Sequence, residues 1–197
     1  EGDLMRIVLN NNINNDLEVH FRVKSKPWLK SCEKSVPESI KYEELTMPDY
    51  LERSAKDFPD DTAMVFVGYK LTYRQFKDQV DRFAACLTDF GIKKDDDDAV
   101  AILLPNCIPC VVAYYAALKI GAIVVMNNPL YSDPELEHQF QDSESKVLIT
   151  IDALGNRMID LRPKTKIKQI VYMGIGDFLN PIKRFLGKKL KNSPLPM

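Results

Sequence analysis

Four short apolar runs in the second half of the chain constrain its fold more than any other feature. They alternate with segments of helical pattern and comprise Ala99–Leu104, Ala122–Met126, Lys146–Ile151 and Ile167–Met173. Strands that are apolar along their whole length are typical of parallel sheets with helices on both faces. Right-handed crossovers then produce a doubly wound layer. The expected fold class is therefore α/β, with a mostly parallel sheet flanked by helices.

The segments between these runs predict helices over Ile108–Lys119, Ser132–Asp142 and Ala153–Leu161. Ser132 and Glu135 form a capping-box pattern at the start of the second helix. Upstream, Thr46, Pro48 and Asp49 predict another helix start. The apolar face of that helix would consist of Leu51, Ala55 and Phe58. Two short strands are expected next, over Thr62–Val67 and Lys70–Thr72.

The clearest helical periodicity begins after Thr72, which can cap the helix. Apolar residues recur every three or four positions at Tyr73, Phe76, Val80, Phe83, Leu87 and Phe90, and Gly91 ends the pattern. We interpret this stripe as core packing, with a ligand groove as the alternative. Before the helices, residues 1–19 are expected to be a disordered leader and residues 20–45 an extended surface arm. Residues 46–197 then form the α/β part.

The charge distribution is uneven although the formal net charge is only −1. Nothing in it requires nucleic acid as a partner. Residues 162–197 are strongly basic, and residues 178–191 combine an apolar stripe with a basic face. Such a segment can lie on an anionic membrane surface or pack as an ordinary amphipathic helix. The expected location is cytoplasmic, with peripheral contact at the inner membrane surface left open, and a homodimer is also left open.

Several polar or reactive groups are candidates for chemistry. Asn106 follows an apolar strand, where it can cap the next helix, the reading we favour, or donate to a ligand. The turn Gly174–Gly176 lies where a phosphate turn would, but Leu179 occupies the third glycine position. His20 and His138 have no partners that suggest catalysis. The run Asp95–Asp98 is expected to be a solvated turn and not a cation site.

Cys107 and Cys110 form a C-x-x-C pattern within a span of twenty residues that has a single charge, Lys119. A zinc site would need two further ligands, which no second C-x-x-C supplies. We expect two small apolar residues at the start of a buried helix, and no disulfides among the four cysteines. Pro109, Gly121 and the charge also argue against a membrane span and favour a buried helix, a turn and a buried strand.

In order and spacing, four segments resemble the AMP-forming acyl-CoA synthetases, the adenylate-forming ligase family. They are Leu71–Phe76, Gly91–Lys94, Val100–Asn106 and Asn128–Tyr131. From Pro27 onward the chain is similar to the start of a long-chain fatty acid–CoA ligase, including the Pro-Trp-Leu arm. Two departures are the four aspartates at 95–98 and the pair Met126–Asn127, both in turns.

The resemblance implies a reaction of fatty acid, ATP and coenzyme A with Mg²⁺, by way of an acyl-adenylate. The family's phosphate loop, later core motifs and mobile C-terminal domain have no counterpart in the 197 residues. No catalytic residue or metal ligand is therefore assigned, the cofactor-binding residues are unknown, and this N-terminal portion is expected to be inactive alone. The alternatives are a ligase for an aryl or short-chain acid, or a non-catalytic lipid-binding or membrane-associated module.

Overall fold

The computed structural model describes residues 27–37, 39–94 and 96–174, which fall in two compact units, Glu1–Glu44 and Leu45–Met197. In the first unit, a 3-10 helix, η1 (Pro27–Ser31), lies within the arm that was expected to be extended. Pro27 favours this turn because its ring fixes φ near the helical value. The Cys32 amide donates to the Leu29 carbonyl at 3.4 Å. The expected leader lies outside the described residues.

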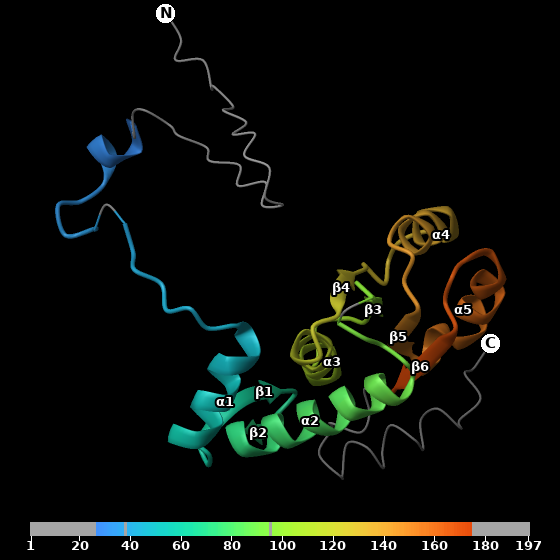
Figure 1. The fold of residues 1–197 in the computed structure, drawn as a ribbon, viewed down its shortest axis with the longest axis horizontal. Coiled ribbons are helices and arrows are strands. Elements are labelled where there is room, and N and C mark those ends of the chain that lie inside the picture. Colours follow the sequence, from blue (N-terminus) through green and yellow to red (C-terminus); the bar gives the residue numbers. More distant parts are fainter. Residues whose placement is uncertain (1–26, 38, 95, 175–197) are drawn as a thin grey trace, which may run out of the picture. The chain divides into compact units, whose positions relative to one another are not determined.

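The second unit opens with two capped helices and a hairpin (Figure 1). The helix α1 (Met47–Asp57) begins at the N-cap Thr46, whose amide donates to the Asp49 carboxylate at 2.8 Å. The strands β1 (Thr62–Phe66) and β2 (Tyr69–Thr72) pair antiparallel. The longer helix α2 (Tyr73–Asp89) follows with a second capping box, between Thr72 and Gln75. Both capping boxes satisfy amides that a helix start leaves unpaired.

A four-stranded parallel sheet forms the centre of this unit, which confirms the expected fold class. Its strands are β3 (Ala99–Leu103), β4 (Ile123–Met126), β5 (Val147–Ile151) and β6 (Gln169–Met173), in the order β4-β3-β5-β6. Val100 of β3 pairs with Val124 on one side and with Val147 on the other. The connections contain α3 (Ile108–Lys119), α4 (Asp133–Asp142), η2 (Asp152–Leu154), α5 (Gly155–Leu161) and η3 (Arg162–Lys164).

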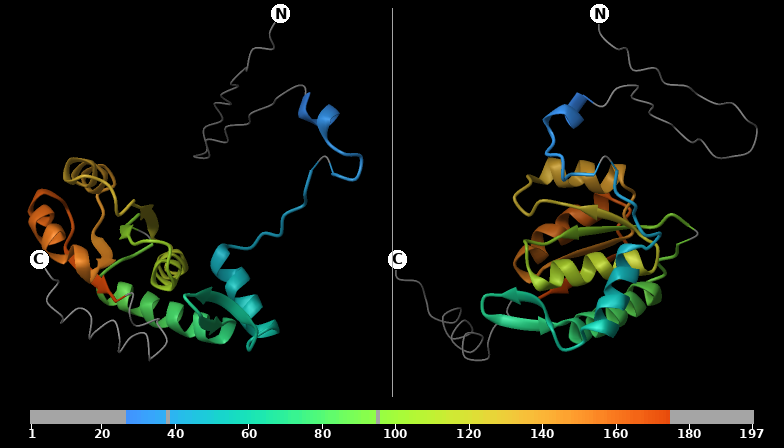
Figure 2. Two further views of the ribbon diagram at one scale, coloured as in Figure 1. Left: turned by 180° about the vertical axis from the view of Figure 1, so that it is seen from behind. Right: turned by 90° about the vertical axis from the view of Figure 1, so that its left-hand side faces the viewer.

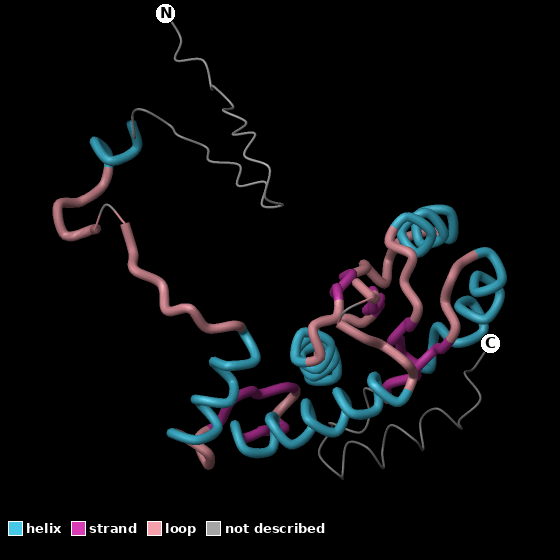
Figure 3. Tube along the Cα trace, in the orientation of Figure 1, coloured by secondary structure: helices cyan, strands magenta, loops and turns pink. Residues whose placement is uncertain are grey.

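Alternate residues of the strands enter two separate cores, as a doubly wound sheet requires. Val100 and Ile102 pack with α2 and α3, whereas Ala101 and Leu103 pack with α4 and α5. Figures 1 and 3 show these two pairs of helices on opposite faces of the strands, and the side view in Figure 2 shows the same layering. Phe140 of α4 is fully buried, and burial of a side chain of this size stabilises the fold by about 2–3 kcal/mol.

Three apolar positions differ from the expectation that they are buried. Phe58 and Phe90 are 58% and 39% exposed, because each is the C-cap residue and lies beyond the last full turn of its helix. Strand β4 was expected to be buried, yet Ile123 is 49% exposed. The reason is its place at the end of the strand order, where β3 is its one neighbouring strand among the described residues. The interior of the predicted stripe, including Phe76, Val80 and Leu87, is buried as expected.

The charge within the apolar span belongs to an ion-pair cluster on three helices. Lys119 of α3 contacts Glu52 of α1 and Asp81 of α2. Lys77 of α2 lies 3.2 Å from Glu52 and 2.6 Å from Asp81. The span thus divides into a 12-residue helix and an edge strand. No helix within the described part of the chain is long and apolar enough to cross a bilayer.

Candidate functional site

The strand order places a topological switch point beside β3. From β3 the chain crosses to β4 on one side and then returns past β3 to β5 on the other. The helices that follow these strands therefore leave on opposite faces, α3 on one and α4 on the other. In open α/β sheets such a point opens a crevice at the carboxyl ends of the strands, where ligands bind. The candidate site is this carboxyl end, with the loop 104–107 and η2 around it.

Thr150 fixes the floor between the two strands at the switch point. Its side chain is fully buried, and its hydroxyl donates to the Leu103 carbonyl at 3.2 Å. The hydrogen bond adds a side-chain donor at a carbonyl near the end of β3, where the ladder pairs Leu103 with Thr150. The ends of β3 and β5 are thereby held together beneath the crevice. A buried, hydrogen-bonded side chain therefore lies beneath the crevice.

Asn106 lies exposed at this end of β3, and the prediction that it caps the helix is wrong. The N-cap residue of α3 is Cys107, which makes no side-chain cap bond, and the helix starts at Ile108. Among the described residues the Asn106 side chain has no hydrogen-bond partner. The amide is therefore available to a ligand in the crevice.

A second amide, Asn127, follows the neighbouring strand β4 and is only 4% exposed. Its backbone amide donates to the Ile102 carbonyl, and its Nδ2 donates to the Val125 carbonyl, each at 2.8 Å. Its Oδ1 is buried without a partner among the described residues. A buried acceptor left unpaired costs about 1–3 kcal/mol. The Asn127 Oδ1 is therefore a buried acceptor at the carboxyl end of the sheet that no described residue satisfies.

In the sequence alone, Asn127 stands out only as part of a departure from a family pattern. The usable signal was its position as the first polar residue after an apolar strand. The loop that follows is held in place by α5, because Arg157 contacts Asp133 and the Tyr131 carbonyl. Asn128 Oδ1 also accepts from the Leu130 amide at 3.0 Å.

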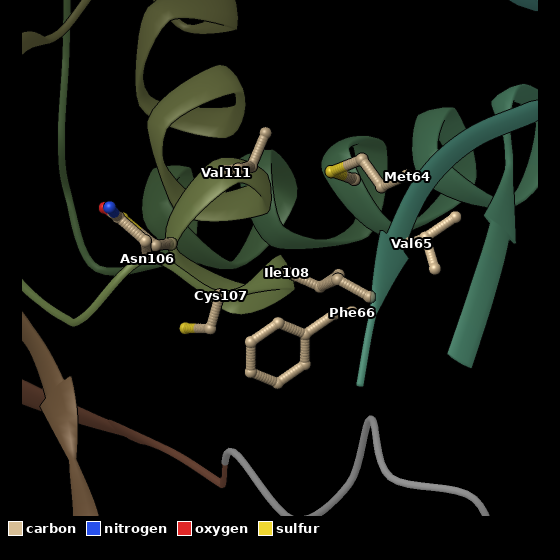
Figure 4. A pocket seen from close by; sticks show the side chains of 8 residues that line it. Met64, Val65, Phe66, Asn106, Cys107, Ile108 and Val111 are labelled. Atoms are coloured by element: carbon tan, nitrogen blue, oxygen red, sulfur yellow. The ribbon is translucent and has the colours of Figure 1, made fainter. Parts of the chain in front are cut away.

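A pocket of about 300 Å³ lies between β1 and the start of α3. Figure 4 shows Met64 and Phe66 reaching it from β1, and Asn106, Cys107 and Val111 from the other side. Its lining is apolar except for the Asn106 amide. Burial raises the pKa of the Cys107 and Cys110 thiols, which also line this pocket. The apolar lining suits an apolar group, and Figure 4 shows the Asn106 amide directed away from Met64 and Phe66.

The aspartate run at the opposite end of the sheet differs from its expectation. Asp96 and Asp97 are exposed, but Asp98 is buried, with 1% exposed. Its Oδ2 accepts from the Lys93 amide at 3.0 Å, and its other oxygen pairs with Lys146. Burial alone raises the pKa of Asp98, but Lys146 and the Lys93 amide outweigh it and hold the pKa below its usual value. Asp98 is therefore a charged residue with a structural role. It is buried because it directly precedes the buried strand β3.

The remaining candidates do not join the site. His138 is exposed on α4, and Gly174 directly follows β6. His20, Asp95, Ile175, Gly176, Leu179 and the basic segment 178–191 lie outside the described residues. Within the described ranges, no group of three His, Cys, Asp or Glu side chains could hold a metal ion. At the carboxyl end of the sheet, the available side chain of Asn106 thus adjoins a pocket.

Comparison with known proteins gives a family match over most of the chain. The family model described as AMP-binding enzyme matches residues 51–189. A long-chain-fatty-acid–CoA ligase of Bacillus subtilis is 38% identical over 154 residues, which are 78% of this chain and 27% of that protein. A ligase of the same name from Escherichia coli is 33% identical over 80% of this chain and 28% of its own length. The chain thus spans little more than a quarter of the length of these relatives.

Solved structures show the same fold. A fatty acyl CoA synthetase of Mycobacterium tuberculosis matches with a TM-score of 0.57 and 27% identity, over 73% of this chain and 27% of that one. A long-chain-fatty-acid-CoA ligase of Archaeoglobus fulgidus matches with a TM-score of 0.62 over 68% of this chain and 28% of that one. Its 22% identity supports the fold alone.

Proposed function

Because the chain belongs to the AMP-binding enzyme family, we propose that it is the N-terminal α/β part of an ATP-dependent long-chain fatty acid–CoA ligase. The observation that carries this proposal is the 38% identity to the Bacillus subtilis ligase across 78% of the chain. The family model covers residues 51–189 and thus both ends of the parallel sheet. It therefore includes the switch point and the loops around it.

The proposed reaction has two steps. The fatty acid carboxylate attacks the α-phosphorus of ATP, the bond to the β-phosphate oxygen breaks, and pyrophosphate leaves. The sulfur of coenzyme A then attacks the acyl carbonyl, and AMP leaves with the electron pair of the broken C–O bond. Mg²⁺ would neutralise the phosphates. We assign it no ligand, since the described residues contain no carboxylate cluster that fits it.

In this proposal, residues 46–197 complete the core sheet and wall the ligand crevice. The buried Thr150–Leu103 bond keeps the crevice floor rigid, and Asn106 donates to or accepts from the bound ligand. The unpaired Oδ1 of Asn127 would receive a donor from the ligand or from another part of the enzyme. Residues 20–45 would be a surface arm, with 1–19 as a leader.

The test is a pyrophosphate-release assay on the product of the complete reading frame. ATP and coenzyme A are supplied with palmitate, benzoate or acetate in parallel. We expect turnover with palmitate to exceed turnover with either other acid, and the 197-residue chain alone to stay at background. Preference for benzoate or acetate would show that the substrate is an aryl or a short-chain acid and not a long-chain fatty acid. Retained acyl chain without ATP binding would favour a lipid-binding module and contradict the ligase proposal.

We further propose a cytoplasmic protein with peripheral membrane contact through residues 178–191. The support is the sequence pattern alone, because that segment lies outside the described residues. Flotation with anionic and neutral liposomes tests it. If the basic face makes the contact, the segment should bind anionic vesicles, and added salt should weaken that binding. Equal partition into both lipid types would contradict it.

A further inference from the structure

Two cysteines occupy the first turn of α3 with no role in the proposed reaction. Cys107 is the N-cap residue, and Cys110 is the third residue of the helix. The Cys110 amide donates to the Cys107 carbonyl at 3.1 Å, which closes a regular turn between them. Helical geometry separates Cα atoms three residues apart by about 5 Å. A disulfide accepts Cα separations of about 4.4–6.8 Å, so this backbone can carry one without moving far.

Both thiols can be reached by one route. They are 5% and 6% exposed, yet both line the pocket of about 300 Å³ between β1 and α3. Figure 4 shows Cys107 at the start of α3, on the other side of this pocket from Phe66 of β1. A small reagent that enters the pocket therefore meets both sulfurs. The other two cysteines differ: Cys32 is exposed in the first unit, and Cys86 is half-buried on α2.

The environment distinguishes the two sulfurs. Burial raises the pKa of each thiol, but the Cys110 amide partly offsets this for Cys107. The pKa of Cys110 is raised by burial and further by the neighbouring Cys107. As the N-cap residue, Cys107 lies at the helix start, which favours a thiolate, and Cys110 lies in position to resolve an adduct formed on it. Thiol oxidation fits this pair better than metal binding does, since no third His, Cys, Asp or Glu joins the two cysteines among the described residues.

We propose that Cys107 and Cys110 are a redox-active dithiol that a small-molecule disulfide oxidises from the pocket. The Cys107 thiolate attacks one sulfur of the oxidant, the oxidant S–S bond breaks, and its first thiolate leaves and takes up a proton. The Cys110 sulfur then attacks the Cys107 sulfur after losing its proton. The mixed disulfide breaks, and the second oxidant thiol leaves with that proton. Two protein thiols are oxidised, and one disulfide is reduced to two thiols.

This chemistry would act on the candidate site because Asn106 directly precedes Cys107 and lines the same pocket. A closed disulfide removes the Cys107 sulfur from the pocket wall and restrains the first turn of α3. The inference concerns the thiols alone and does not depend on the proposed ligase reaction. Its test therefore uses a chemical readout.

The most direct test uses a variant that carries both Cys32→Ser and Cys86→Ser, which leaves only the two thiols in question. The reduced protein is treated with oxidised glutathione, quenched by alkylation and analysed by intact mass and peptide mapping. We expect the number of alkylated thiols to fall from two to none, with a mass loss of two hydrogens per chain. The rate should rise about tenfold between pH 7 and pH 8, because the thiolate fraction rises tenfold per unit below the pKa.

Adding a single further substitution separates the roles of the two sulfurs. With Cys110→Ser, glutathione should remain attached to Cys107, since no second thiol resolves the adduct. With Cys107→Ser, the rate of reaction should fall at least tenfold. Full alkylation of both thiols after treatment, or a disulfide between two chains, would overturn the proposal. The variant with only Cys32→Ser and Cys86→Ser is sufficient to show whether the disulfide forms, even where a further substitution impairs folding.

Discussion

Polar side chains have partners at one end of the parallel sheet and are left without them, among the described residues, at the other. At the amino end, the buried carboxylate of Asp98 is paired with Lys146 and accepts from the Lys93 amide. At the carboxyl end, Asn127 keeps a buried oxygen without a partner in the described structure, and Asn106 is exposed beside a pocket. The same strands, β3 and β5, run through both ends. The difference therefore comes from the loops and not from the sheet.

This contrast separates residues that stabilise the fold from residues that are available for function. Satisfied buried groups contribute to stability, whereas unsatisfied ones cost free energy unless another group completes them. The amino end behaves as the first kind and the carboxyl end as the second. Each substitution below is chosen to break or sharpen this division, in order of decreasing effect on the free energy of unfolding.

Asp98→Asn should produce the largest loss of stability. The substitution removes the buried charge that pairs with Lys146, and we expect the free energy of unfolding to fall by about 2 kcal/mol. This value is below the usual range for buried pairs because the Lys146 side chain is 35% exposed and can regain water. Urea denaturation followed by circular dichroism measures the change.

Asp96→Asn is the matched control, since Asp96 is exposed in the same turn. It should change the free energy of unfolding by less than about 0.5 kcal/mol. Equal effects of the two substitutions would show that the amino end depends on net charge and not on the buried pair.

Acidification should reduce the difference between wild type and Asp98→Asn. The pKa of Asp98 is lowered in the folded state, so its stabilisation is complete above the unfolded value of about 4. It is then lost as the pH falls through the folded pKa. Unfolding midpoints between pH 7 and pH 3 measure this, and the two proteins should differ at pH 6 and converge towards pH 3. A difference that grows on acidification would contradict the assigned pairing.

Thr150→Val should have an intermediate effect at the carboxyl end. Valine keeps the volume but removes the hydroxyl's hydrogen bond to the Leu103 carbonyl, which costs about 1 kcal/mol. Thr62→Val, at an exposed position in β1, is the control and should be nearly neutral. If Thr150→Val were stabilising, the hydroxyl would not be needed to hold β3 and β5 together. Denaturant midpoints of both variants decide between these results.

The sequence predicted the elements of the sheet better than its ends. Caps at Thr46, Thr72 and Ser132 are local signals, and all three helices begin where the pattern indicated. The burial of Asp98 was missed because it depends on Lys146, which is distant in sequence. The exposure of Ile123 was missed for a related reason. Strand order decides which strand lies at the edge, and periodicity does not contain that order.

The candidate site was predicted only in part for the same reason. Asn106 was identified from its position after a strand, but its role was assigned to the cap that Cys107 occupies. A shift of one residue at the start of a helix decides between these roles, and sequence patterns rarely fix helix ends so closely. Asn127 becomes notable only when its neighbours β3 and β4 are seen side by side.

The central claim is that the carboxyl end serves ligand binding while the amino end serves stability. The most direct measurement compares Asn106→Ala and Asp98→Asn in the product of the complete reading frame, with kcat/KM for palmitate and the unfolding midpoint taken on the same samples. We predict that Asn106→Ala lowers kcat/KM about tenfold and changes stability by less than about 0.5 kcal/mol. Asp98→Asn should lower stability by about 2 kcal/mol and keep kcat/KM within about twofold at temperatures where it is folded. Unchanged activity in Asn106→Ala, or a loss of activity only in Asp98→Asn, would contradict the account.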